Sequence, residues 1–315
     1  MYDPTKPYKY QIIESIKSTW KTPNVAVSGS LVSKKFSYSE YHHSDGIGSK
    51  GIYHWQKRSF KNAVIDAMAM NLNDLAMVRA TPYAVVDHMM LPKDDHKAIL
   101  KIIKDLSSVC RQYKIAITGG ETAIHYDAEG MELSISMLGF VKKSVQNKFR
   151  RGDVLIGIAS SGLHSNGFSK VRGIFGEEFR SDFIKPTSIY LIEVLKLTEK
   201  FDIGGMMHIT GGAYTKLKDL LGNSLDTKVF RSHKLQPQKI FHELFNRKIS
   251  DEEMYKTFNC GVGYILSVRK EQANKCLSAI KIFQPTLSVK LYLVAAKLLS
   301  NPNFPIKLWN IKYAV

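Results

Sequence analysis

The chain has 315 residues, a length that accommodates two domains of about 150 residues each. Hydrophobic residues make up 44% of it, but no apolar run reaches the roughly 18 residues of a membrane span, and three scattered cysteines are too few for a disulfide framework. The net charge of +17 raises nucleic acid as a partner, yet the 45 Lys and Arg residues are scattered, which is typical of a solvated surface that attracts small anions.

The N-terminal sequence, MYDPTKPYKY, lacks the apolar core of a secretory signal. Together with the cysteine count, this predicts a protein of the reducing cytoplasm. We expect no membrane partner. We also expect no nucleic-acid partner, because the basic residues are neither gathered on one helix nor interleaved with aromatic side chains.

Helix and strand signals alternate through the first half of the chain. Apolar residues recur at helical spacing over 97–113, and KIAITGGET at 114–122 predicts a short buried strand that ends in a glycine turn. Residues 131–141 alternate between apolar and polar, as a half-buried strand does. The polar stretch NKFRRGD at 147–153 interrupts this pattern, so we place a domain boundary there.

The two expected domains therefore span 1–149 and 150–315. The second half continues the alternation of elements. Its expected strands and helices are strands over 153–160, 262–268 and 289–296 and helices over 188–201 and 271–283. This alternation predicts a mixed α/β fold in both halves.

The first motif with chemical potential is HHSDGIGSKG, residues 42–51, in which Asp45 is followed by Gly46, a second glycine and Lys50. A carboxylate at a strand end can hold a hard divalent cation, while glycine amides approach phosphate oxygens and the lysine adds positive charge. Taken alone, Asp-Gly is also a common turn.

The second motif, AVIDAMAMNLNDLAMVRATP at 63–82, has a helical apolar pattern that contains Asp66, Asn73 and Asp74. Asp66 and Asn73 are seven residues apart, which places them on one helix face among Met and Ala side chains. Polar groups on such a face need partners. They either face a ligand or satisfy buried backbone groups.

The third motif is TGGETA at 118–123, where Gly119 and Gly120 follow a strand and precede Glu121. Three acidic motifs in the same half of the chain favour joint binding of Mg²⁺ ions that bridge nucleotide phosphates. The sequence contains neither a P-loop nor a GxGxxG fingerprint after a strand, so this nucleotide site would be of another type.

Two further loops lie in the second half. SSGLHSNG at 160–167 has more polar groups than a simple turn needs, and HITGGA at 208–213 is a second loop that contains histidine and glycine. Each histidine taken singly fits a structural role as well as a functional one. The two loops together favour a functional site.

The ordered motifs resemble those of the phosphoribosylformylglycinamidine cyclo-ligase family, also called aminoimidazole ribonucleotide synthetase. The similarity runs from about residue 5 to residue 268. It is carried by SDGIGSK (44–50), AVIDAMAMNLNDLAMVRATP (63–82), TGGETA (118–123), GDVLIGIASSGLHSNGFSKVR (152–172), KPTSIY (185–190), HITGGA (208–213) and MYKTFNCGVGYIL (254–266).

This resemblance implies a two-domain α/β (α+β) protein with the aminoimidazole ribonucleotide synthetase-like fold. In that superfamily the N-terminal domains of two subunits pair their sheets into a central β-barrel, so a homodimer is implied. The implied reaction is ATP-dependent ring closure of formylglycinamidine ribonucleotide to aminoimidazole ribonucleotide, with release of ADP and phosphate. Phosphorylation of the formamide oxygen would give an iminophosphate that the amidine nitrogen of the same molecule attacks.

The resemblance also implies roles for individual residues. Asp45, Asp74 and Glu121 match acidic positions assigned to Mg²⁺ and the ATP phosphates, and Asp45 and Asp74 join His164 as the implied catalytic set. His164 is the candidate to shuttle a proton or to steady the phosphoryl oxygen. The other residues implied to bind ATP are Lys17, Gly46, Lys50, Asp66, Asn73, Gly119 and Gly120. Those implied to bind substrate are Ser161, Ser165, Asn166, Gly167, His208, Thr210, Gly211 and Gly212.

Several departures separate this chain from the family pattern. The interval TPNVAVSGSLVSKKFSYSEYHH is poor in glycine, Ala213 replaces the third glycine of a HITGGG pattern, and the last 40 or so residues match poorly. Two alternatives therefore stay open beside the cyclo-ligase. One is another ATP-dependent superfamily member that acts on a related amide or phosphate, and the other is a non-catalytic dimeric homologue.

Overall fold

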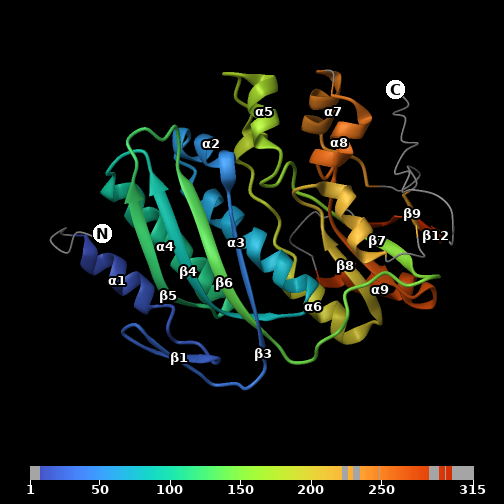
Figure 1. Cartoon of the computed structure of the whole chain (residues 1–315), viewed down its shortest axis with the longest axis horizontal. Helices are drawn as coiled ribbons and strands as arrows, with labels where there is room; N and C mark the ends of the chain where they lie inside the picture. Colours follow the sequence, from blue (N-terminus) through green and yellow to red (C-terminus); the bar gives the residue numbers. More distant parts are fainter. Residues whose placement is uncertain are drawn as a thin grey trace. The chain divides into compact units, whose positions relative to one another are not determined.

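A computed structural model describes residues 8–221, 226–229, 235–247, 249–283, 291–294 and 296–299 of the chain (Figure 1). They form two compact units. The first comprises residues 1–144 and 183–189, and the second comprises residues 145–182 and 190–315. The mixed α/β class predicted from the sequence is confirmed. The expected boundary after residue 149 lies near the first passage between units, whereas the excursion at 183–189 was not predicted.

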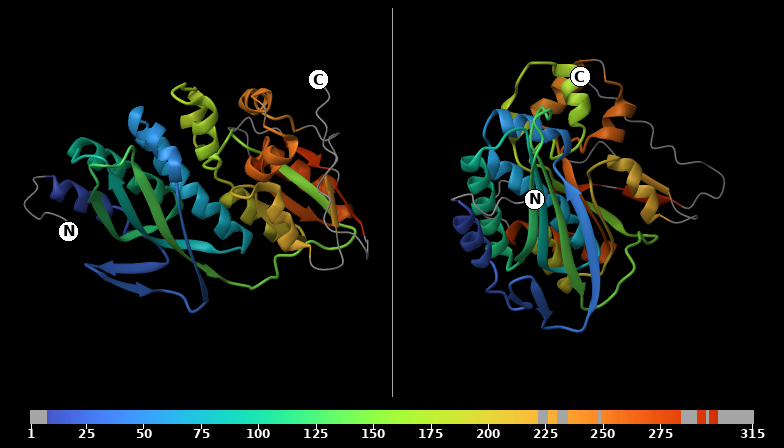
Figure 2. Two further views of the ribbon diagram at one scale, coloured as in Figure 1. Left: turned by 45° about the horizontal axis from the view of Figure 1, so that its top comes forward. Right: turned by 60° about the vertical axis from the view of Figure 1, so that its left-hand side comes forward.

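The first unit is a four-stranded sheet with helices on one face and a separate two-stranded hairpin (Figures 1 and 2). Its elements in chain order are α1 (Lys9–Lys17), β1 (Val25–Ser28), β2 (Leu31–Lys34), β3 (Ser39–Gly46), the 3₁₀ turn η1 (Gly48–Lys50), α2 (Gly51–Gln56), α3 (Phe60–Met77), β4 (Thr81–Leu91), α4 (His96–Tyr113), β5 (Ala116–Ile124) and β6 (Glu132–Val141). Strands β1 and β2 form the hairpin within the stretch that was noted as poor in glycine.

The order of strands in the main sheet is β3-β6-β4-β5, so β3 and β5 are its two edges. Strand β6 pairs antiparallel with both neighbours, and β4 pairs parallel with β5. The register sets Asp45, Ile135, Asp87 and Gly120 in one row across all four strands. Because neighbours in a row share a face, this row defines the helix-covered face of the sheet.

Helix α4 shows why the sequence pattern predicted a helix here. Asp95 caps it by accepting a hydrogen bond from the Ala98 backbone N–H, and Lys114 ends it with a left-handed backbone of φ 59°. Its buried residues recur three or four apart and face the sheet: Ala98, Ile99, Ile102, Ile103, Leu106, Ser107 and Cys110. The helix predicted over 97–113 and the strand predicted over 131–141 are both confirmed.

The glycine turn predicted at the end of residues 114–122 is wrong. Strand β5 runs straight through Gly119 and Gly120 to Ile124. Glycine is needed at position 120 for a different reason, because a Cβ there would lie 2.4 Å from Oδ1 of Asp87 on the neighbouring strand. Gly120 therefore reflects a close side-chain approach across the sheet.

The second unit contains a four-stranded antiparallel sheet of order β11-β7-β10-β8 and a two-stranded pair of β9 with β12. Its elements are β7 (Val154–Ala159), α5 (Phe168–Phe175), η2 (Ser181–Ile184, at the passage into the first unit), α6 (Leu191–Lys200), β8 (Ile203–His208), η3 (Ala213–Leu220), β9 (Asp226–Val229), α7 (Lys239–Asn246), α8 (Asp251–Thr257), β10 (Val262–Val268), η4 (Lys270–Gln272), α9 (Ala273–Phe283), β11 (Leu291–Val294) and β12 (Ala296–Leu299).

Most elements predicted for this half are confirmed. Strands β7 and β10 and helices α6 and α9 fall within the predicted ranges. The strand expected over 289–296 corresponds to β11, except that residue 296 begins β12, and residues 289, 290 and 295 lie outside the described residues.

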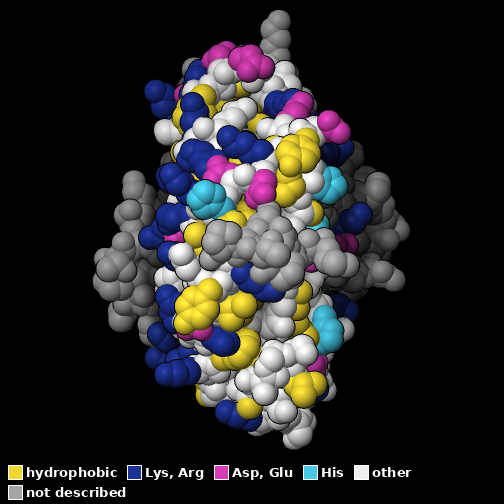
Figure 3. Space-filling model, turned by 90° about the vertical axis from the view of Figure 1, so that its left-hand side faces the viewer, with side chains coloured by type: hydrophobic (Ala, Val, Ile, Leu, Met, Phe, Trp, Pro, Cys, Tyr) yellow, Lys and Arg dark blue, Asp and Glu magenta, His cyan; other side chains and the backbone are white. Residues whose placement is uncertain are grey.

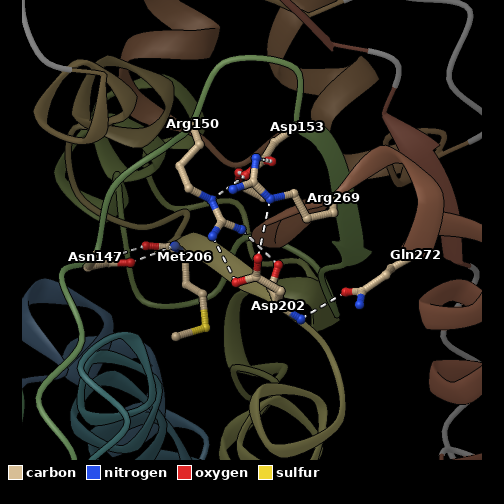
Figure 4. Close-up of polar contacts among 8 residues, drawn as sticks. Asn147, Arg150, Asp153, Asp202, Met206, Arg269 and Gln272 are labelled. Carbon is tan, nitrogen blue, oxygen red and sulfur yellow. Dashed lines mark hydrogen bonds and ion pairs between the residues drawn. The ribbon is translucent and has the colours of Figure 1, made fainter.

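The stretch 147–153, predicted as an interruption, is tied into the second unit by polar contacts (Figure 4). Arg150 pairs with Asp153 and Asp202, and Arg269 pairs with the same two carboxylates. Asn147 accepts a hydrogen bond from the Met206 N–H and donates one to its carbonyl. Its carboxamide thus occupies the free edge of β8 as a neighbouring strand would.

Lys and Arg side chains are spread over the face drawn in Figure 3, with Asp and Glu between them, rather than gathered in one patch. None of the helices in the described parts of the chain combines the length and apolar character needed to cross a membrane.

Candidate functional site

The first group of candidate residues lies at the β3 edge of the first unit, and we call it the β3-edge cluster: His43, Asp45, Asn71 and Asp74. His43 and Asp45 alternate on β3 and face α3, which supplies Asn71 and Asp74. Nε2 of His43 lies 3.3 Å from Oδ2 of Asp74, and Nδ1 lies 3.0 Å from Oδ1 of Asn71. Asn71 donates to the Asp45 carbonyl at 3.1 Å.

Electrostatics in the β3-edge cluster favour positive charge. The hydrogen bond with Asp74 is the main cause that raises the pKa of His43, and Asn71 and Asp45 act in the same direction against partial burial. Both ring nitrogens face acceptor oxygens, so the protonated ring satisfies both. The raised pKa reports the negative potential of Asp45 and Asp74, and the same potential favours a metal cation, which would compete with the proton on His43.

The structure places two other predicted ATP ligands in a closed network inside the first unit. Lys50 and Asp66 are fully buried, and Nζ lies 2.8 Å from Oδ2. His54, also fully buried, lies 2.8 Å from the same oxygen through Nε2. The other carboxylate oxygen accepts hydrogen bonds from the Thr187 N–H at 2.8 Å and from its hydroxyl at 2.6 Å.

Neighbouring groups and burial set the protonation state of each residue in this network. Burial raises the pKa of Asp66, but Lys50 and His54 outweigh it, so the pKa falls and the group stays ionised. Burial lowers the pKa of Lys50 and that of His54. An ammonium and a carboxylate in contact, with a neutral imidazole beside them, is the arrangement we infer.

The same face of α3 holds the segment 183–189. Asn62 donates to the Ile184 carbonyl and Asn73 donates to the Ser188 carbonyl, both at 2.9 Å, while Lys50 donates to the Lys185 carbonyl at 2.7 Å. The prediction that Asp66 and Asn73 share one helix face is confirmed. Both residues bond groups of the segment 183–189, and Asp66 also bonds the buried side chains of Lys50 and His54. These contacts fit the alternative that the sequence left open, in which both satisfy buried groups, and their assignment to ATP stays a prediction.

Glu121 lies apart from the β3-edge cluster. It is exposed on β5, opposite His88, in the row next to that of Asp45, and therefore on the other face of the sheet. Strands β3 and β5 are the two edges, three strand spacings or about 14 Å apart. Within one chain, Glu121 does not join Asp45 and Asp74.

Lys17 also lies on the β5 side of the first unit. It is the last residue of α1, half exposed, and 3.7 Å from Glu14. The chain just after it is fastened to β5, because Thr19 accepts from the Ile117 N–H and Trp20 donates to the Ile117 carbonyl. The predicted ATP residues of the first unit thus fall into a β3-edge group, a buried group and a β5-edge group.

Among the residues that the structure describes, no three His, Cys, Asp or Glu side chains are grouped so as to hold a metal ion. The β3-edge cluster supplies two carboxylates. That number fits Mg²⁺, which usually takes one or two protein carboxylates and fills its other positions with water and substrate phosphates.

In the second unit, the two predicted loops lie side by side. Asn166 of the first loop donates a hydrogen bond to the hydroxyl of Thr210 in the second. The rings of His164 and His208 are 6.1 Å apart, and Tyr190 and Tyr264 complete a buried aromatic group around them. The structure therefore brings together loops that are 40 to 50 residues apart in the sequence.

The remaining predicted substrate residues occupy the rims of these loops. Ser161, Ser165 and Asn166 are half-buried, Gly167 has φ 75° at the start of α5, and Gly212 is exposed with φ 77°. Gly211 lies next to Asn166, since a Cβ there would be 3.0 Å from Oδ1 of Asn166. Ala213, which replaces the expected glycine, also has a left-handed backbone, with φ 42°.

His164 is 1% exposed and has a left-handed backbone of φ 60°. Its Nε2 accepts a hydrogen bond from the Ser161 N–H at 3.2 Å. A ring nitrogen that accepts such a bond has its lone pair engaged, so Nε2 is not available as a base in this conformation. The arrangement supports a role for His164 in shaping the loop, and its catalytic assignment stays a prediction.

Sequence reasoning missed three polar residues of the first unit: His43, Asn71 and Asp87. Alternation along β3 places His43 on the face of Asp45, and helical spacing places Asn71 near Asp74, so both signals were present. Asp87 is 4% exposed on β4, a strand that was not predicted from the sequence. Burial raises its pKa to about 7.

An α/β unit with carboxylates at a sheet edge, followed by an antiparallel α/β unit with paired histidine and glycine loops, defines a protein of the AIR synthase class. Residues 41–141 match the family model described as "AIR synthase related protein, N-terminal domain", and residues 150–284 match that of its C-terminal domain.

Curated relatives narrow this class. The chain is 35% identical over 273 residues to a phosphoribosylformylglycinamidine cyclo-ligase of Saccharolobus solfataricus, covering 84% of this chain and 82% of the relative. It is 33% identical over 252 residues to the enzyme of that name from Clostridium perfringens, covering 75% and 76%. The chain belongs to the phosphoribosylformylglycinamidine cyclo-ligase family.

Solved structures share the fold at lower identity. Hydrogenase maturation protein HypE in complex with ATP aligns with a TM-score of 0.66 at 14% identity, covering 94% of this chain and 88% of that one. Thiamine-monophosphate kinase from Stenotrophomonas maltophilia aligns with a TM-score of 0.66 at 16% identity, covering 93% and 94%.

Proposed function

We propose that this protein is an ATP-dependent cyclo-ligase that closes the ring of formylglycinamidine ribonucleotide to give aminoimidazole ribonucleotide, ADP and phosphate. The observation that carries the proposal is the 35% identity to a curated cyclo-ligase across 82% of that relative. The two open alternatives, a different superfamily enzyme and a non-catalytic homologue, have no comparable support.

The chemistry sets what the protein must provide. A formamide oxygen is a poor leaving group, so the γ-phosphoryl group of ATP is transferred to it and ADP leaves. The amidine nitrogen of the same molecule then attacks the activated carbon, phosphate departs, and a proton is lost from nitrogen. The attack is intramolecular, so holding the substrate in its folded conformation supplies much of the rate.

For the nucleotide, we assign Asp45 and Asp74 of the β3-edge cluster to Mg²⁺ and the phosphates of ATP. The ion would neutralise charge on the transferring phosphoryl group. Two carboxylates whose negative potential raises the pKa of His43 suit this role. Asp66, Lys50 and Asn73 would act indirectly, by fixing the loop that begins at Asp45 and the segment 183–189.

A homodimer is part of the proposal. The main sheet of the first unit has an open face on which Val86, His88 and Glu121 are exposed, with Val86 at 40%. Pairing of two such sheets into a barrel would cover that face. Within one copy, Glu121 and Lys17 lie far from Asp45. Pairing would allow Glu121 and Lys17 of one copy to contribute to the same site as Asp45 of the other.

For the ribonucleotide, we assign the paired loops of the second unit. Ser161, Ser165, Asn166 and Gly167 supply polar groups from one loop, and His208, Thr210, Gly211 and Gly212 supply them from the other. The contact between Asn166 and Thr210 supports a joint surface.

The test is incubation of the purified chain with ATP, Mg²⁺ and formylglycinamidine ribonucleotide, with ADP and aminoimidazole ribonucleotide measured together. Equal amounts of the two products are expected. ADP without aminoimidazole ribonucleotide would contradict ring closure and favour another ATP-dependent activity. Sedimentation at micromolar concentration tests the dimer, and a monomer would contradict it.

A further inference from the structure

The segment 258–263, which connects α8 to β10 and includes the first two residues of β10, lies against both loops of the second unit. Its backbone carbonyls at Gly261 and Gly263 accept hydrogen bonds from the Ser160 N–H at 3.0 Å and the Ile209 N–H at 2.9 Å. One segment thus fixes the beginning of the loop at 160–167 and the loop at 208–213 at the same time.

Asn259 is the polar centre of this segment and is 3% exposed. Its Nδ2 donates to the Gly162 carbonyl at 2.8 Å, and its Oδ1 accepts from the Gly261 N–H at 2.9 Å. Its own carbonyl accepts from the Tyr214 hydroxyl at 3.0 Å. Tyr214 follows the 208–213 loop directly, so a single residue is bonded to both sides of the predicted substrate surface.

The neighbours of Asn259 leave little freedom for other arrangements. A Cβ at Gly167 would lie 2.4 Å from the Phe258 ring, and a Cβ at Gly263 would lie 2.0 Å from the Tyr190 hydroxyl and 2.8 Å from the His164 ring. Cys260 and Gly261 both have left-handed backbones, with φ 45° and 95°. The loop around His164 is therefore held by a segment whose Asn259 lies 97 residues after Gly162 in the chain.

We propose that Asn259 is a positioning residue for the reaction: its carboxamide sets the 160–167 loop in the conformation that receives the ribonucleotide. The inference rests on the proposed function, in which these loops bind formylglycinamidine ribonucleotide. Asn259 itself touches no substrate, and its effect passes through Gly162 and Tyr214.

Position 259 requires a carboxamide, because its side chain must donate a hydrogen bond to one backbone group and accept one from another. Asn259→Asp keeps the shape and the acceptor but replaces the donor with a second oxygen that faces the Gly162 carbonyl. The matched control is Asn274→Asp, the same substitution at an exposed position of α9 in the same unit.

The experiment measures folded fraction, hydrogen exchange of residues 160–167, and KM and kcat for both substrates in the wild type and the two variants. For Asn259→Asp we expect faster exchange in 160–167 and KM for the ribonucleotide raised about tenfold or more, with KM for ATP changed less than about threefold. Asn274→Asp should match the wild type. A merely structural defect would lower the folded fraction and leave KM per folded molecule unchanged.

Unchanged exchange in 160–167 of the folded Asn259→Asp variant would overturn the inference, as would equal increases in KM for both substrates. If the variant does not fold, Tyr214→Phe removes only the hydroxyl that bonds the Asn259 carbonyl, and a smaller change in the same direction is expected. If the wild type makes no aminoimidazole ribonucleotide, the proposed function fails, while the exchange measurement still decides whether Asn259 sets this loop.

Discussion

Lys50 and Asp66 form an ion pair from which water is excluded: their charged atoms are 2.8 Å apart and neither side chain is exposed. The pair contains a lysine from the 3₁₀ turn η1, which follows β3, and an aspartate from α3. A third element, the segment 183–189, completes it through Thr187 and the Lys185 carbonyl. The stability of the first unit thus depends on the charges of Lys50 and Asp66, two residues that the family resemblance assigns to ATP binding.

Removal of one member of this ion pair should lower the stability of the first unit. Lys50→Met leaves the Asp66 carboxylate buried without its main cation, so we expect a loss of about 3–5 kcal/mol in the free energy of unfolding. Lys17→Met is the matched control, because Lys17 is half exposed and should change stability by less than about 0.5 kcal/mol. Urea denaturation of both variants provides the measurement. Equal midpoints would refute the role given to Lys50.

The carboxylates of the β3-edge cluster should matter for turnover rather than for folding. Asp45→Asn or Asp74→Asn is expected to lower kcat more than about tenfold, equivalent to about 1.4 kcal/mol of barrier, while the fold persists. Asp127→Asn, in an exposed loop, is the control. Retention of more than about a tenth of the activity by both variants would remove the metal role assigned to these residues.

Asp87 should make the stability of the first unit depend on pH. Burial raises the pKa of this carboxyl to about 7 from an ordinary value of 3.8. Between these values the folded chain holds a proton that the unfolded chain has released, so this group lowers stability as pH rises. Asp87→Asn removes the titration. We expect its stability relative to wild type to increase between about pH 4 and pH 7, and a constant difference would show that Asp87 ionises normally.

The two glycines of β5 give a paired test of close packing. Gly120→Ala should destabilise by about 1–3 kcal/mol, because the new methyl group meets the Asp87 carboxyl. Gly119→Ala should be neutral or stabilising by up to about 1 kcal/mol, since its Cβ would lie 3.7 Å from Val86. Thermal unfolding of each variant compares them. Similar effects at the two positions would mean that Asp87 moves aside freely.

Two substitutions separate the possible roles of His164. His164→Gln keeps an acceptor near the position of Nε2 but cannot titrate, and His164→Ala keeps neither. If the ring acts by closing the 161–164 turn, the Gln variant should retain kcat within about tenfold while the Ala variant loses more. A loss of about 10² or more in both variants, measured per folded molecule, would instead assign proton transfer to His164.

Local patterns predicted several of the longer elements but not others, such as β4 and β8. The helix predicted over 97–113 and the strand predicted over 262–268 followed from apolar residues and their spacing, and both are confirmed. The shared face of Asp66 and Asn73 also followed from spacing alone. Local patterns failed where a distant residue decides the outcome, as at Gly120, which is small because of Asp87, and at Lys50, whose partner carbonyl is 135 residues away.

The sequence predicted the individual motifs of the candidate site but not how these motifs are arranged in space. The acidic motifs were found, but only the strand order shows that Glu121 and Asp45 lie on opposite edges of one sheet. The closeness of the loops at 160–167 and 208–213 depends on antiparallel pairing of β10 with both β7 and β8. No short window of sequence contains that information.

The excursion of residues 183–189 into the first unit has a consequence for protein synthesis. A ribosome must add 121 residues after Asp66 before Thr187 exists, a delay on the order of ten seconds. Strand β6 ends at Val141, so the sheet and helices of the first unit are complete before the segment 183–189, which bonds to α3, has been made. A fragment that stops at residue 149 never acquires that segment, so Asp66 in it would meet water where the complete protein has a threonine.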